Sequence, residues 1–69
     1  MSIQLWNHKR SGESYVVEFN NGTVTEACGP LHHSDIPEVM RNNFVPNPDP
    51  ELAEWMTENQ EEFILSQVH

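Results

Sequence analysis

Hydrophobic and polar residues alternate along the first part of the chain, a pattern typical of β-strands. Three segments show it, at residues 3–8, 14–20 and 23–28. The dipeptide Asn21-Gly22 separates the second segment from the third, and it suits the two positive-φ positions of a tight hairpin turn. The pattern therefore predicts a three-stranded antiparallel meander.

The hairpin turn sets the expected register, because a two-residue loop places Phe19 opposite Val24. A five-residue loop at 9–13 then brings Leu5 opposite Val17. One face of the sheet collects the expected core residues Ile3, Leu5, Tyr15, Val17, Phe19, Val24 and Cys28. The opposite face carries Trp6, Val16 and Ala27, together with His8. Either the following helix covers this second face, or it stays exposed as a docking surface with Trp6 as its anchor.

Two helices are expected after the strands. Ser34 or Asp35 can cap a short helix over 35–42, with Pro37 in its first turn. After a proline-stiffened connector, Asp49-Pro50-Glu51 is a strong start for a C-terminal amphipathic helix over 50–67. Its apolar stripe comprises Leu52, Trp55, Met56, Phe63 and Ile64, with Asn59 and Gln60 interrupting it. We therefore expect a single α+β domain over 1–69, with the last helix packed on one sheet face.

The charge balance narrows the classes of partner. The 69 residues include eleven acids and three bases, giving a net charge of −8. Binding to nucleic acid, or to an anionic membrane, requires clustered lysine and arginine, so we expect neither partner. A chain of this length has little room for both a core and a deep pocket, which favours a binding role over an enzymatic one. A protein partner with a basic surface fits the charge best.

Cysteine usage and the start of the chain indicate the compartment. The single cysteine, Cys28, cannot form an internal disulfide. The first eight residues lack the basic start and apolar run of a signal peptide. We therefore expect a cytoplasmic protein.

The segment Cys28-Gly-Pro-Leu-His32-His33 contains the residue types of a metal or thiol site. Its spacing matches no recognised zinc pattern, and its acidic surroundings disfavour the thiolate form of Cys28. Gly29-Pro30 instead favours the end of a strand and a turn. We expect no catalytic residue, metal or cofactor here, while a small metal- or thiol-dependent enzyme using these three side chains remains the alternative.

The predicted C-terminal helix carries acids without any lysine or arginine. These acids are Glu51, Glu54, Glu58, Glu61 and Glu62. Like charges four residues apart on a helix repel each other and mildly destabilise it. A basic partner would relieve this repulsion by pairing with the acids. We expect Glu58, Glu61 and Glu62 to contribute to a partner surface.

These observations favour a small non-enzymatic accessory or regulatory protein. It would bind a protein partner through the exposed sheet face, the acidic helix or both. Its expected partner-binding residues are Trp6, His8, Val16, Ala27, Glu58, Glu61 and Glu62. A self-associating structural protein, paired through its Trp6 faces or its sheet edges, is a further alternative.

Overall fold

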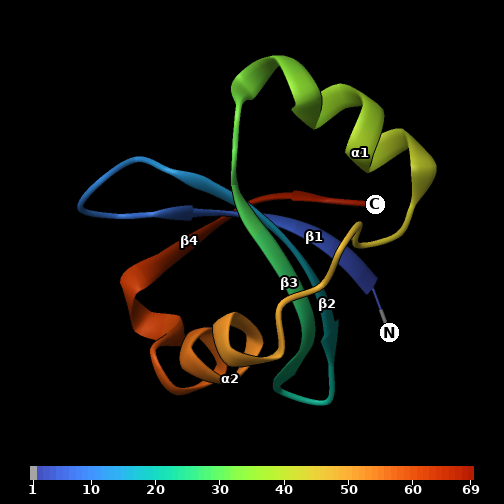
Figure 1. Cartoon of the computed structure of the whole chain (residues 1–69). Coiled ribbons are helices and arrows are strands. Elements are labelled where there is room, and N and C mark those ends of the chain that lie inside the picture. Colours follow the sequence, from blue (N-terminus) through green and yellow to red (C-terminus); the bar gives the residue numbers. More distant parts are fainter. Residues whose placement is uncertain (1) are drawn as a thin grey trace.

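The computed structural model describes residues 2–69 and has a four-stranded antiparallel sheet with one helix on each face (Figure 1). The elements are β1 (Ser2–His8), β2 (Ser14–Asn20), β3 (Thr23–Leu31), α1 (Ile36–Asn42), α2 (Pro50–Glu58) and β4 (Phe63–Val68). Single 3-10 turns precede α1 and β4. The strand order across the sheet is β3-β2-β1-β4, so β3 and β4 form its edges. The α+β prediction is confirmed, but the sheet has a fourth strand.

The β2–β3 hairpin forms at the predicted turn. Asn21 and Gly22 have φ values of 51° and 80°, and Phe19 pairs with Val24 as expected. The register then shifts by one residue between Phe19 and Glu18, so that Glu18 lies opposite Glu26. Such a bulge moves one residue out of the alternation. It therefore turns Ala27 towards the core and removes Glu26 from the inward position that strict alternation assigns to it.

The register of β1 differs from the prediction by one residue. Leu5 pairs with Val16 and Trp6 with Tyr15, whereas the loop length alone indicates Leu5 opposite Val17. A slip of one residue moves every side chain of a strand to the other face. Of the two alternatives for the face with Trp6, Val16 and Ala27, exposure is wrong, because these residues are 6%, 0% and 0% exposed.

Both faces of the sheet are covered, which produces two small cores. The core beneath α2 contains Trp6, Tyr15, Val17, Val24, Ala27, Ala53, Met56 and Phe63. The core beneath α1 contains Ile3, Leu5, Val16, Met40 and Val45. Trp6 and Ala27 thus lie on the opposite side of the sheet from Val16. A single docking surface cannot include all three residues.

The start of α2 was predicted correctly, whereas its end was not, and Asp35 precedes α1 without the predicted side-chain cap bond. Asp49 caps α2 by accepting hydrogen bonds from the N–H groups of Glu51 and Leu52. Asn59 then closes the helix, because its backbone N–H and its side-chain amide both donate to the carbonyl of Trp55. The chain turns and returns as β4, so the predicted helix over 50–67 is wrong beyond Glu58. No helix among residues 2–69 combines the length and apolar character needed to cross a membrane.

Gly29-Pro30 lies inside β3 rather than after it, because the strand continues to Leu31. A proline is tolerated there because β3 is an edge strand, where a missing N–H breaks no ladder. Gly29 has a φ of 150°, and a Cβ at this position would lie 2.5 Å from the ring of Tyr15. The glycine therefore lets the edge strand approach the aromatic core closely.

The two tryptophans provide a test of this burial pattern. Trp6→Ala removes a side chain that is 6% exposed and should lower the free energy of unfolding by about 3–5 kcal/mol. Trp55→Ala removes a side chain that is 41% exposed and should cost at most about half as much. Urea denaturation followed by far-ultraviolet circular dichroism measures both. A larger loss for Trp55→Ala would contradict the register of β1.

Candidate functional site

The tryptophan at the surface is Trp55, which the helical pattern had assigned to the core. It is 41% exposed, whereas its neighbours on α2, Ala53 and Met56, are buried. Its ring stacks against His8 with centroids 6.1 Å apart and meets Phe63 edge-on at 5.5 Å. Trp55 is therefore held by aromatic neighbours on one side while the rest of its ring faces solvent.

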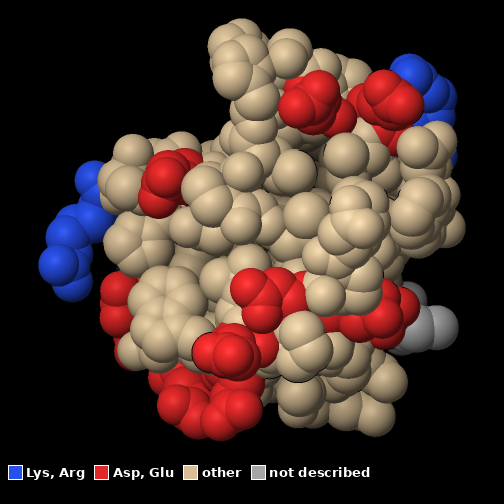
Figure 2. Space-filling view, in the orientation of Figure 1, with Lys and Arg blue, Asp and Glu red and all other residues tan. Residues whose placement is uncertain are grey.

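Acidic side chains of α2 surround Trp55. Glu51, Glu54, Trp55 and Glu58 line a shallow hollow of about 230 Å³, called here the acidic hollow. The three glutamates are exposed, and Figure 2 shows acidic side chains gathered over the part of the surface that α2 forms. An exposed aromatic ring between carboxylates presents both an apolar contact and negative charge.

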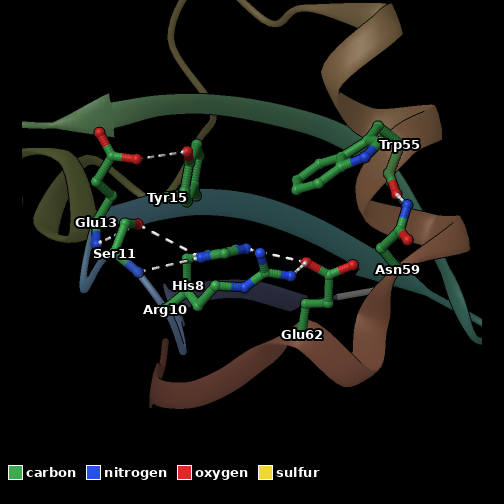
Figure 3. A network of polar contacts seen from close by, with 8 residues as sticks. All are labelled: His8, Arg10, Ser11, Glu13, Tyr15, Trp55, Asn59 and Glu62. Carbon is green, nitrogen blue, oxygen red and sulfur yellow. Dashed lines mark hydrogen bonds and ion pairs between the residues drawn. The ribbon is translucent and has the colours of Figure 1, made fainter.

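A second hollow lies on the other side of Trp55. It has a volume of about 420 Å³ and is called here the His8 hollow. Its lining comprises His8, Arg10, Ser11, Glu13, Tyr15, Trp55 and Glu62. Figure 3 shows Tyr15 and Trp55 on either side of the space above the His8 ring. The indole of Trp55 therefore lines both hollows.

The hydrogen bonds of His8 join the β1–β2 loop to the turn before β4 (Figure 3). The backbone N–H of Ser11 donates to Nδ1 of His8 over 3.3 Å, so Nδ1 is unprotonated in this arrangement. Nε2 then carries the ring proton and donates to Oε1 of Glu62 over 3.2 Å. Nη2 of Arg10 lies 4.0 Å from the same oxygen. The ring of His8 thus links the two turns.

Ser11, His8 and Glu62 are the residue types of a hydrolase triad, but their hydrogen bonds serve to link the two turns. The hydroxyl Oγ of Ser11 lies 3.4 Å from Nδ1, whose lone pair already accepts the backbone N–H of Ser11. The same hydroxyl also accepts the N–H of Glu13 over 3.2 Å. Activation of a serine requires a base that is free to take its proton. We therefore interpret the three side chains as loop structure.

Tyr15 is the buried polar member of the His8 hollow. Burial, and secondarily the negative charge and hydrogen bond of Glu13, raise the pKa of the Tyr15 phenol above its ordinary value of 10.0. The hydroxyl donates to Oε1 of Glu13 over 3.4 Å. The phenol of Tyr15 is therefore neutral below this raised pKa. It is a hydrogen-bond donor to Glu13 at this side of the hollow and adds no charge there.

The predicted partner-binding residues are dispersed in the structure. Glu58 and Glu61 are exposed, whereas Glu62 is half-buried and bonded to His8. Trp6, Val16 and Ala27 lie in the two cores. Sequence reasoning missed Glu13, Tyr15 and Trp55 as lining residues. The available signal was the spacing of Glu51, Trp55 and Glu58, which places an aromatic residue among acids on one face of a helix.

Cys28 and the two histidines do not come together. Cys28 lines a hollow of about 370 Å³ beneath α1, and burial raises the pKa of its thiol, which opposes activation. His32 and His33 stack on each other with centroids 4.5 Å apart, and Nδ1 of His32 is bonded to Ser34. Within the part of the chain that the structure describes, no three histidine, cysteine or acidic side chains are grouped to hold a metal ion.

Comparison of the chain with protein-family models, with curated proteins and with solved structures finds no match. The function is therefore inferred from the two hollows themselves. Both hollows are lined by the exposed indole of Trp55 and by carboxylates, and the His8 hollow also has Tyr15 as a second aromatic wall.

The phenol of Tyr15 provides a spectroscopic test of the His8 hollow, because it is the only tyrosine. A raised pKa means that the folded state binds the proton more tightly than the unfolded chain. This difference contributes to the free energy of unfolding. The contribution is fully present below about pH 10 and is lost as the pH rises through the folded-state pKa. Ultraviolet absorbance of the phenolate should give a folded midpoint above 10.0, and Glu13→Gln should lower it only in part because burial is the larger cause.

Glu18→Gln is the control for this titration, because Glu18 bonds to Thr25 and not to Tyr15. It should leave the midpoint unchanged. A folded-state midpoint at or below that of the denatured chain would contradict the burial of the phenol.

Proposed function

We propose that this protein is a small, non-enzymatic accessory or regulatory protein that binds a basic segment of a protein partner. The binding surface is the acidic hollow and the His8 hollow, with Trp55 between them. Arginine or lysine side chains of the partner enter these hollows, and its neighbouring apolar groups cover the indole. The protein acts in the cytoplasm, where a lone cysteine stays reduced.

The distribution of charge supports a basic partner. Residues 34–69 contain eight acids and Arg41, a net charge of −7, whereas residues 1–33 contribute only −1. The acids of α2 therefore produce a local negative field rather than an even one. Such a field steers a basic partner towards α2 and raises the rate of encounter.

Trp55 is the single observation that carries the proposal. An exposed indole can contribute both apolar contact area and a cation–π contact, which at exposed sites stabilises by about 0.5–1 kcal/mol. Tryptophan is also enriched among residues that dominate interface energies. Glu54 and Glu58 lie beside the ring and can pair with the same cation. The combination selects a cationic side chain over an uncharged one.

Arg10 supports the same chemistry within the molecule. Its guanidinium extends from the exposed β1–β2 loop, with Nη2 4.0 Å from Glu62 at the rim of the His8 hollow. The side chain of Arg10 is 87% exposed, so this contact is loose and a partner's cation can replace it.

An arginine-rich peptide is the direct probe, with the matched peptide carrying uncharged citrulline in place of arginine as control. Isothermal titration calorimetry should detect binding of the arginine peptide alone, and the affinity should fall as salt is added. Trp55→Ala should weaken binding at least about tenfold. Glu54→Gln combined with Glu58→Gln should weaken it about three- to tenfold.

Asp35→Asn combined with Glu38→Gln is the charge-matched control, because it removes two exposed acids beside α1 instead of α2. It should change the affinity by less than the pair on α2. An equal loss from both pairs would mean that net charge alone attracts the peptide. Equal binding of the citrulline peptide would contradict recognition of a cation.

A further inference from the structure

The two edge strands of the sheet differ in how their outward backbone N–H and C=O groups are covered. At β3, the hydroxyl Oγ1 of Thr57 bonds to both the N–H and the C=O of Val24, and the N–H of Asp49 donates to the carbonyl of Ala27. Pro30 removes another donor from this strand. Covering an edge and placing proline in it are devices that prevent pairing with another chain. The β3 edge is therefore closed by α2 and by the connector.

The β4 edge has no such cover in the part of the chain that the structure describes. β1 pairs with one side of β4, and no strand lies on its other side. In an antiparallel ladder, alternate residues of an edge strand direct their N–H and C=O groups away from the neighbouring strand. β4 therefore presents a row of free donors and acceptors to an incoming strand.

Three side chains of β4 are both apolar and exposed. Ile64, Leu65 and Val68 are 55%, 53% and 57% exposed. The strand Phe63–Val68 contains no charged residue, although the chain as a whole has a net charge of −8. An exposed hydrophobic edge is a surface that pairs with another strand. Its neutrality selects an uncharged occupant rather than the basic partner of α2.

We propose that β4 pairs with β4 of a second copy of this chain, in antiparallel orientation, to form one continuous eight-stranded sheet. A second copy supplies what this edge requires, namely a free strand edge, apolar side chains and no charge. A twofold axis also makes such a contact self-complementary and closed. The association therefore ends at the dimer, because β3, the other edge of each copy, is covered.

The side chains of β4 match in this arrangement. A register shift opposite Leu5 and Trp6 places Leu65 and Val68 on the α2 side of the sheet with Phe63, because they pair with Trp6 and Gln4. A twofold axis between Leu65 and Ser66 sets Phe63 of one copy opposite Val68 of the other. Residues directly opposite each other share a face. Phe63 and Val68 of the two copies therefore meet on the same side, while Leu65 lies opposite Ser66 and Ile64 opposite Gln67.

The placement of charge permits two acidic copies to approach. α2 packs mainly on β3, at the far edge of each sheet from β4, and it reaches β4 through the contact of Trp55 with Phe63. Seven strand spacings of about 4.8 Å then separate the two β3 strands by about 34 Å. This separation exceeds the screening length of about 8 Å at physiological salt. At the start of β4, the backbone N–H of Lys9 donates to the carbonyl of Glu62 and Nη2 of Arg10 lies 4.0 Å from Oε1 of Glu62, so basic residues stand beside an acid at that end.

Sedimentation equilibrium over a range of protein concentrations tests the dimer. The unmodified protein should reach twice the monomer mass and no more. Leu65→Lys combined with Val68→Lys should weaken association at least about tenfold, because it replaces exposed apolar side chains at the contact with four like charges, two from each copy. Phe44→Lys is the control, since Phe44 is an exposed hydrophobic residue of the connector, 54% exposed, and its replacement should leave the dimer intact.

Amide hydrogen exchange of the unmodified protein provides a second readout that needs no variant. Amides of β4 should gain protection as the concentration rises, while those of β3 should not. A protein that stays monomeric up to its solubility limit would overturn the proposal. So would a dimer that survives the double lysine variant, or protection that rises at β3 instead.

Discussion

The packing of Phe63 against four aromatic rings is the interaction on which the rest of this structure depends. Its centroid lies 5.9 Å from Trp6, 5.0 Å from His8, 5.7 Å from Tyr15 and 5.5 Å from Trp55. These rings come from β1, β2 and α2, so one side chain of β4 joins the sheet to its helix. Aromatic pairs at such distances add about 0.5–1.5 kcal/mol each beyond the apolar area that they bury.

The same ring positions the candidate site. His8, Tyr15 and Trp55 line the His8 hollow, and each of them rests against Phe63 on its inner side. The indole of Trp55 is thereby held at the surface with its remaining area open. In a domain this small, the core and the binding surface share residues. A substitution at Phe63 would therefore alter both the stability of the fold and the shape of the hollow.

Sequence patterns were informative where the conformation is determined locally. Asn21-Gly22 identified the hairpin, and Asp49-Pro50 identified the start of α2, because turns and caps depend on a few adjacent residues. The pairing of β1 depends on tertiary packing, and a slip of one residue placed Trp6 on the α2 side of the sheet. Trp6 thus fills the core, while Trp55 is exposed. Burial of both sheet faces also removes the exposed face that a single covering helix would have left.

The last strand was missed because its hydrophobic residues continue the helical pattern of α2. Asn59 and Gln60 interrupt that pattern, and Glu61 and Glu62 would stand at the disfavoured end of a longer helix. Both features indicated a break, but neither specifies that the chain after it pairs with β1. The candidate site was missed with it, since Phe63 brings His8 and Tyr15 beside Trp55. A contact between residues so distant in sequence has no signature in local periodicity.

Nuclear Overhauser contacts of the Phe63 ring test this arrangement most directly. The structure predicts contacts from its ring protons to the indoles of both Trp6 and Trp55, with cross-strand backbone contacts between Phe63 and His8. Sequential amide–amide contacts continuing from Glu58 through Gln67, without contacts to Trp6, would show an unbroken helix and contradict the account.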